Sequence, residues 1–262
     1  GVQTCALPIS EPVNHVLPAW DLLTGAYAAF AMLAAFHHRD ATGQGQEVRV
    51  PLSDVAIGTV ANLGSLAEVL TFGANRERLG NAVYGAFGRD FVTQDGVRLM
   101  IMAITPRQWS GLVAVLGIGN EIAAIEADRG VSFAKDEGVR FEHRDVLFPL
   151  VAQKVSSWTY SKLKAVLDDV GGCYGPYQTM LAAAHDPMLV GNNPIFGRAK
   201  NPSGADYPAA GSFATLPGQD RIAPAPAPFL GAQSEEILST RLGLDSGAIA
   251  KLIDAGIVGA HG

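Results

Sequence analysis

The first clear pattern along the chain is a nearly unbroken apolar run at residues 22–36 (LLTGAYAAFAMLAAF). It is followed by His37, His38 and Arg39, and cations are favoured at the C-terminal end of a helix. The pattern predicts a helix over about residues 22–39. The run is shorter than the roughly 18–20 apolar residues that span a bilayer, so we expect a buried helix and no membrane span.

The next segment changes from helical to alternating spacing. Turn-forming residues ATGQGQ (41–46) precede EVRVPL (47–52), in which polar and apolar residues alternate as in a strand. Ser53 and Asp54 then predict the cap of a second helix that continues to about Leu70. Helix, strand and helix in succession indicate an α/β fold.

A second region begins after a glycine-rich loop. The sequence FVTQDGVRLMIMAI (91–104) predicts a β-hairpin whose turn is Asp95-Gly96. Thr105-Pro106 predicts the start of a helix, with proline at its first position. Residues 120–170 have the spacing of amphipathic helices.

The last third is rich in proline. Residues 186–232 contain most of the prolines, which predicts an extended linker, and two helical stretches close the sequence. We therefore expect part of a large domain at 11–75, a small domain at 76–190, and a linker with a C-terminal return to the large domain at 191–262.

Composition narrows the classes of partner. The chain has 262 residues, of which 48% are hydrophobic and 17% charged, so it can bury a substantial core. Its net charge of -6 gives no basic surface for a nucleic-acid partner. Cys5 and Cys173 are far apart, so we expect neither a disulfide framework nor a metal site, and a reducing cytoplasm fits.

The first residues are excluded from the fold prediction. Residues 1–10 (GVQTCALPIS) lack the basic and apolar regions of a signal peptide. They resemble the translation of an adapter oligonucleotide used in sequencing libraries. We interpret them as non-native and expect the true N-terminus to be missing.

Several motifs, taken in order, carry a resemblance to a known family. Asp21-x-x-Thr24-Gly25 is followed by a helix that ends in LAAFHHRDATGQGQEVRVPLSD, then by RLGN (78–81), Asp95-Gly96, Gln108-Trp109 and APAPFLGAQSEEIL (225–238). This ordered set, from residue 12 to 259, resembles the CaiB/BaiF (class III) CoA-transferases. The resemblance implies an incomplete Rossmann-like large domain with a smaller α+β domain, and an interlocked homodimer when the protein is full length. The family segment that supplies most contacts to CoA would precede this chain.

The resemblance also implies a covalent mechanism in which Asp21 is the nucleophile. Its carboxylate would attack an acyl-CoA thioester, and CoA would pass through an aspartyl thioester to an acceptor carboxyl. In the closest pattern, donor and acceptor are the two carboxyls of one C5 dicarboxylic acid. CoA is then a substrate, and no cofactor or metal is implied.

A different reading of Asp21 follows from its position alone. Aspartate is a preferred helix N-cap, so Asp21 could serve only as a cap. Because it is predicted at a helix start, the helix dipole would favour its ionised form in either role.

The glycine-rich loop before the hairpin supplies candidate donors for an oxyanion. Backbone N–H groups of Gly80, Asn81 and Gly85 would be unobstructed by side chains. An ordinary turn between domains explains the same residues equally well.

Other residues are candidates for binding the substrate. A second carboxyl requires a cation or paired donors, and the candidates are Arg89, Arg78, and His15 with Asn14. Tyr84 could line the acyl pocket, although an aromatic residue in such a loop also serves packing. Solvated or structural roles stay open for all of them.

Three alternative functions share these motifs. An intermolecular CoA-transferase of formyl or carnitine type would use Asp21 with an external acid. A 2-methylacyl-CoA racemase would pair the aspartate with an upstream histidine for proton transfer. A non-catalytic interaction domain would use Asp21 only as a cap.

Overall fold

The computed structural model describes residues 17–259 of the chain. Expectations for residues 1–10, and for Asn14 and His15, therefore lie outside the described residues. The chain divides after Tyr177 into two compact units, residues 1–177 and 178–262, and each is described by itself.

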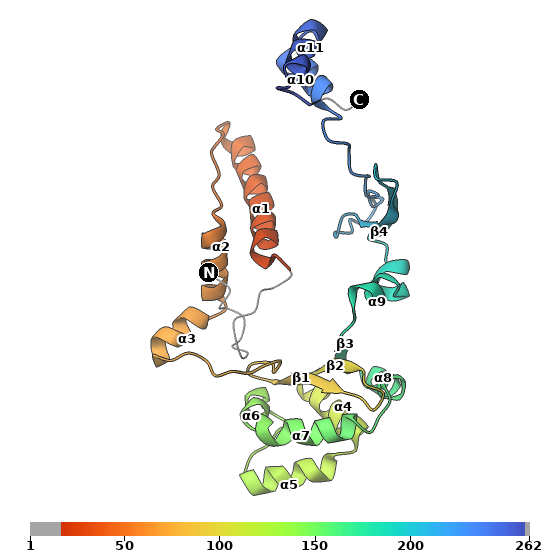
Figure 1. The fold of residues 1–262 in the computed structure, drawn as a ribbon. Helices are drawn as coiled ribbons and strands as arrows, with labels where there is room; N and C mark the ends of the chain where they lie inside the picture. Colours follow the sequence, from red (N-terminus) through yellow and green to blue (C-terminus); the bar gives the residue numbers. More distant parts are fainter. Residues whose placement is uncertain (1–16, 260–262) are drawn as a thin grey trace. The chain divides into compact units, whose positions relative to one another are not determined.

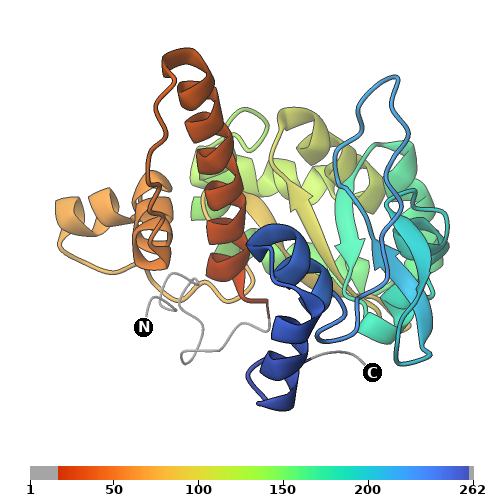
Figure 2. The ribbon, with the colours of Figure 1, turned by 90° about the horizontal axis from the view of Figure 1, so that it is seen from above.

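The first unit opens with three helices, α1 (Ala19–Thr42), α2 (Leu52–Asn62) and α3 (Ser65–Phe72). Helices α1 and α2 pack against each other and lie side by side in two views (Figure 1, Figure 2). Gly43 follows helix α1 as its C-cap, and its φ of 74° is the left-handed conformation that glycine adopts without a steric penalty.

The exposed surface of α1 corrects the expectation of a buried helix. None of its residues is buried, and Phe30 and Leu33 are 71% and 67% exposed. The prediction was wrong because α2 is the element that packs most against α1, and one neighbouring helix covers only one side of it.

Helix α1 is also long and apolar enough to cross a membrane, and α2 with α3, bent by 63°, satisfies the same criteria as a pair. Core helices of soluble proteins share this composition. Length and composition alone therefore do not separate a membrane helix from one that packs against protein.

The segment between α1 and α3 differs from its prediction in two ways. Residues 47–52 form no strand, since no other strand in the described residues pairs with them, and a strand is stabilised by its neighbours. The predicted second helix is two helices, interrupted at Gly64 with a φ of 83°. Neither Ser53 nor Asp54 caps α2, because the N-cap position is Pro51.

A small α+β domain follows, built on a three-stranded antiparallel sheet in the order β1-β2-β3. The strands are β1 (Phe87–Val92), β2 (Arg98–Ala103) and β3 (Cys173–Pro176). The predicted Asp95-Gly96 turn joins β1 to β2, with Gly96 at a φ of 81°. The hairpin prediction is confirmed.

Five helices connect β2 to β3. They are α4 (Pro106–Leu116), α5 (Gly119–Arg129), α6 (Glu137–Glu142), α7 (Arg144–Val155) and α8 (Tyr160–Asp169). Helices α4 and α7 pack against the sheet, and α5 lies beyond them on the same side (Figure 1). Helix α4 begins as predicted, with Pro106 at its first position, and Thr105 and Gln108 form a reciprocal capping box around this start.

The main hydrophobic core lies between the sheet and these helices. Phe87 of β1 is fully buried, and its ring contacts Trp109 of α4 and Phe148 of α7 at centroid distances of 5.3 and 5.4 Å. Leu147 and Val151 of α7 are also fully buried. Phe87 therefore ties the edge strand to both covering helices.

Arg140 is a charged residue inside this domain. It is 0% exposed and donates hydrogen bonds to the backbone oxygens of Phe133 and Ile104. Burial lowers the pKa of its guanidinium, while the nearby Glu137 acts in the opposite direction. These contacts make Arg140 a link between α6 and the end of β2.

The second unit contains short elements within the proline-rich region. They are α9 (Met180–Ala184), the π-helix η2 (Pro187–Gly191), and the antiparallel pair β4 (Phe196–Lys200) and β5 (Asp206–Ala210). The prediction of an extended linker over 186–232 was therefore wrong for its first part. Helices α10 (Ser234–Leu242) and α11 (Ser246–Asp254) confirm the two predicted C-terminal helices.

Candidate functional site

Asp21 lies in the first turn of α1. The helix begins two residues earlier, at Ala19 with Pro18 as N-cap, and no side-chain hydrogen bond caps it. Asp21 is exposed, and its side chain has no hydrogen bond or ion pair within residues 17–259. Its carboxylate is therefore accessible, and the structure gives it no capping role.

One turn further along α1, the hydroxyl of Thr24 is shielded from solvent and has no hydrogen-bond partner in the described part of the chain. Residues three apart on a helix are neighbours on its surface. A shielded hydroxyl without a partner is unfavourable.

The glycine-rich loop forms a tight turn before β1. The N–H of Ala82 donates to Leu79 O at 3.0 Å, and Gly80 has a φ of 57°. Neither the Gly80 nor the Asn81 N–H donates a hydrogen bond to another described residue. Two free backbone donors therefore lie next to each other at this turn.

The loop is fixed to the face of the small domain's edge strand. Val83 N donates to Gly88 O at 2.8 Å, and a Cβ added at Gly88 would lie 2.8 Å from Val83 Cγ2. Only glycine allows this close approach without a shift of Val83. Gly88 is thus one residue that positions the loop.

Asp90 of β1 is a second positioning residue, and the sequence analysis missed it. Its side chain is 3% exposed and accepts hydrogen bonds from Arg98 and Asn81. Burial acts to raise the pKa of Asp90, but the hydrogen bonds from Arg98 and Asn81 hold it below its usual value. The ionised carboxylate therefore links the loop to the sheet.

A cavity of ≈ 430 Å³ lies beside this loop. Three arginines contribute to its lining, together with the turn and residues of α6 and α7. The lining residues are Arg78, Leu79, Gly80, Asn81, Ala82, Arg89, Glu142, Arg144, Asp145, Phe148 and Pro149. The structure therefore brings together four of the predicted candidates: Arg78, Gly80, Asn81 and Arg89.

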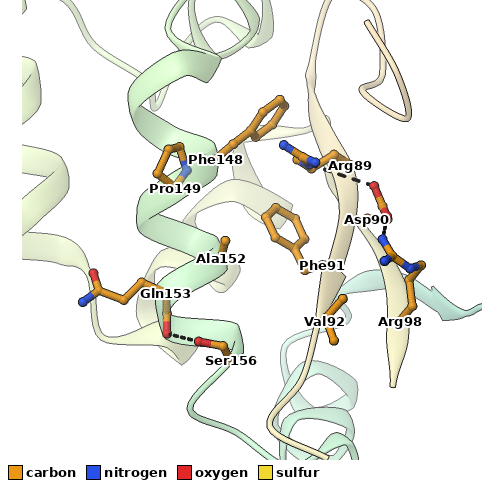
Figure 3. Close-up of a pocket in the computed structure, with 10 residues that line it drawn as sticks. All are labelled: Arg89, Asp90, Phe91, Val92, Arg98, Phe148, Pro149, Ala152, Gln153 and Ser156. Atoms are coloured by element: carbon orange, nitrogen blue, oxygen red, sulfur yellow. Dashed lines mark hydrogen bonds and ion pairs between the residues drawn. The ribbon is translucent and has the colours of Figure 1, made fainter. Parts of the chain in front are cut away.

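A neighbouring cavity of ≈ 520 Å³ shares Arg89, Phe148 and Pro149 with the first. Figure 3 shows Arg89 extending toward Phe148 of α7, whereas Asp90 points away toward Arg98. The Arg89 guanidinium lies 5.2 Å from the centre of the Phe148 ring, within the range of a cation–π contact. Arg89 thus belongs to the wall of both cavities.

Tyr84 does not line the cavity beside the loop. Its ring stacks under the guanidinium of Arg76 at 3.6 Å and meets Phe141 edge-on at 5.2 Å. Arg76 also forms a forked ion pair with Glu68 of α3. In this structure, Tyr84 therefore helps to fix the chain between α3 and β1.

Other candidate groups are separate from this cavity. Within the described residues, no hydrogen bond joins Asp21 to the glycine-rich loop, and Asp21 does not line the cavity beside it. Within residues 17–259, no cluster of three histidine, cysteine or acidic side chains has the arrangement of a metal site. The site thus consists of an accessible carboxylate on one helix and a guanidinium-lined cavity on the small domain.

The family model of CoA-transferase family III matches residues 2–234, and the chain therefore belongs to this family. A solved CaiB/BaiF family protein from Brucella suis has the same fold, with a TM-score of 0.66 at 26% identity. That likeness covers 92% of this chain and 59% of the other.

The chain is also similar to two proteins from Chloroflexus aurantiacus. The chain is 37% identical to 2-methylfumaryl-CoA isomerase over 98% of its own length and 64% of the relative's. It is 25% identical to succinyl-CoA–D-citramalate CoA-transferase over 94% of its length and 59% of the relative's. The chain thus spans about three fifths of these relatives.

Proposed function

We propose that the complete protein moves CoA between the two carboxyl groups of 2-methylfumarate, with Asp21 as the nucleophile. The observation that carries this proposal is the 37% identity to 2-methylfumaryl-CoA isomerase along nearly the whole chain. The accessible, unpaired carboxylate of Asp21 supports the assignment of the nucleophile.

The proposed reaction is a balanced exchange of acyl bonds. A carboxylate oxygen of Asp21 attacks the thioester carbon, and the C–S bond breaks, which releases CoA as a thiolate and leaves a mixed anhydride between Asp21 and the substrate. The thiolate then attacks the Asp21 carbonyl, which releases the substrate carboxylate and leaves an aspartyl-CoA thioester. These two steps move CoA onto the protein without net hydrolysis.

The second half of the reaction returns CoA to the substrate. The other carboxylate of the same acid attacks the aspartyl thioester and forms a new anhydride with release of thiolate. The thiolate attacks the acyl carbon of this anhydride, and the Asp21 carboxylate is regenerated. CoA is a substrate throughout, and the mechanism requires no further cofactor.

An intermolecular transfer is the second candidate, because the chain also resembles a CoA-transferase that is named for two different acids. The two candidates differ in their need for an external acceptor. When isotope-labelled free 2-methylfumarate is added to the reaction, the CoA ester should stay unlabelled if transfer is intramolecular. Turnover that depends on a second acid would favour intermolecular transfer.

The exposed apolar surface of α1 supports a proposal about assembly. We propose that a second copy of the chain packs against this surface of α1 in a cytoplasmic homodimer. In this proposal α1 does not lie in a lipid bilayer. Light scattering coupled to size exclusion should give twice the monomer mass without detergent. A monomer that requires detergent for solubility would contradict this proposal.

The role of Asp21 is tested by substitution in the complete protein. Asp21→Asn should lower the rate of 2-methylfumaryl-CoA isomerisation at least about a thousandfold, because an amide cannot carry the acyl group. Chromatographic separation of the CoA ester isomers measures the rate. Asp40→Asn, which changes another exposed acid of α1, is the matched control and should retain activity. Equal rates for both variants would eliminate Asp21 as the nucleophile.

A further inference from the structure

We infer that the cavity beside the glycine-rich loop is a binding site for a substrate oxyanion, with Arg78 and Arg89 as its principal ligands. The shared chemistry of the ligand is a carboxylate or phosphate group. The inference relies on the proposed function for the source of this anion, but the cavity and its donors are independent of that function.

The first observation is that the guanidiniums of Arg78 and Arg89 donate no hydrogen bond to a carboxylate among the described residues. Arg78 forms no hydrogen bond or ion pair within residues 17–259. Arg89 lies 4.0 Å from Asp90, but the Asp90 carboxylate is hydrogen-bonded to Arg98. Arg144, in contrast, already pairs with Glu77. Two of the three arginines are therefore available to an incoming anion.

The second observation concerns the backbone. Gly80 and Asn81, whose N–H groups donate no hydrogen bond to another described residue, line the same cavity. Guanidiniums and backbone N–H groups are the groups that most often hold carboxylate and phosphate oxygens. The sources of positive charge and of hydrogen-bond donors thus coincide.

The third observation is that part of the site is already ordered. The Arg89 side chain is held over the Phe148 ring, and Asp90 anchors Asn81 through a hydrogen bond. The Arg89–Phe148 contact and the backbone hydrogen bond from Val83 N to Gly88 O reduce the freedom that would otherwise be lost when a ligand binds. The carboxylates Glu142 and Asp145 also line the cavity, so an anion should bind on the side of the loop and β1.

The cavity size separates this site from a simple surface charge pair. A volume of ≈ 430 Å³ exceeds what a single carboxylate fills and falls in the range of small-molecule sites. A substrate end that carries its anion on a short carbon chain would fit. The site would thereby fix one charged end of the substrate during CoA exchange.

The test is a binding titration of the 262-residue chain with two probes, 2-methylfumarate and inorganic phosphate. NMR of the arginine side-chain Nε–H groups follows Arg78 and Arg89 directly. We expect saturable shifts at both arginines with at least one probe. Arg78→Gln and Arg89→Gln should each weaken its binding about tenfold, as expected for loss of one charge-assisted hydrogen bond.

The matched control is Arg107→Gln. Arg107 lies on α4 of the same domain, and its side chain has no ion pair among the described residues. It should leave both dissociation constants unchanged. Tryptophan fluorescence of buried Trp109 verifies that each variant keeps its fold.

The two probes distinguish the sources of the anion. Saturable shifts with 2-methylfumarate alone assign the site to a substrate carboxylate, whereas shifts with phosphate alone assign it to a phosphate group such as those of CoA. Absence of saturable shifts at Arg78 and Arg89 with both probes overturns the inference, as does equal weakening by Arg107→Gln. Asp21→Asn should bind as the unmodified chain does, so failure of this site is distinct from failure of the nucleophile assignment.

Discussion

Replacing Asp90 by asparagine should destabilise the small domain and loosen the glycine-rich loop together. The substitution preserves the shape of the side chain but removes its negative charge. Asp90 is only 5% exposed, and its carboxylate accepts hydrogen bonds from Arg98 and Asn81. A hydrogen bond to a charged group contributes about 1.5–3 kcal/mol. The Arg98 side chain is 56% exposed and regains water when released, so its share is reduced. We therefore expect a loss of about 2–3 kcal/mol.

The assay is thermal or urea unfolding followed by tryptophan fluorescence. Trp109 is 3% exposed and lies in the core of the same domain, so its emission reports this domain's unfolding. For a domain of this size, the predicted loss corresponds to a decrease in Tm of about 10–20 °C. Asp128→Asn, at an exposed acid paired with its neighbour Arg129, should change the free energy of unfolding by less than about 0.5 kcal/mol.

The pH dependence provides an independent check. The pKa of folded Asp90 lies below the ordinary value of 3.8, so its ionised form stabilises the folded state. That contribution is complete above the unfolded pKa and is lost as the pH falls through the folded pKa. The difference in the free energy of unfolding between the unmodified chain and Asp90→Asn should be constant from about pH 7 to 5. It should shrink below about pH 5. A difference that persists at the most acidic pH, or no difference at neutral pH, would refute the role of this carboxylate.

Two further substitutions test the packing that supports the loop. Gly88→Ala should cost about 1–3 kcal/mol, because its Cβ would lie 2.8 Å from Val83 Cγ2. Gly175→Ala on the same sheet is the control, because no atom lies within 4 Å of the added Cβ, and it should leave the free energy of unfolding nearly unchanged. If urea unfolding shows equal losses for Gly88→Ala and Gly175→Ala, the contact with Val83 does not explain the effect. Leu147→Ala should cost about 2–5 kcal/mol, since Leu147 is fully buried, whereas Leu70→Ala, at 75% exposure, should cost little. The urea midpoint of Leu147→Ala should lie well below that of Leu70→Ala, and equal midpoints would contradict this prediction.

Local signals in the sequence predicted the elements whose causes are local. Asp95-Gly96 specifies a hairpin turn, Thr105-Pro106 specifies a helix start, and both are present. The alternating segment 47–52 fails for the opposite reason, because a strand depends on a partner that alternation cannot reveal. Strand β3 at Cys173–Pro176 was missed because four residues carry too little pattern.

In the candidate site, too, the sequence predicted only the features that depend on neighbouring residues. Charged and glycine residues close together in sequence, such as Arg78 and Gly80, could be proposed from sequence and do line one cavity. Glu142 and Asp145 reach this cavity from more than fifty positions away, and only packing brings them there. The burial of Asp90 also depends on packing, because its neighbours in β1 include both Arg89 and Phe91 and give no clear local signal.

The position of β3 in the chain has a consequence for synthesis. Strand β2 is central, yet its partner at Cys173–Pro176 follows five helices later. At synthesis rates of roughly 5–20 residues per second, the interval between the two strands is on the order of several seconds. During this time the apolar sequence RLMIMA has an open edge, which invites pairing with other nascent chains. The shortest strand of the sheet, β3, therefore determines when this edge of β2 is covered during synthesis.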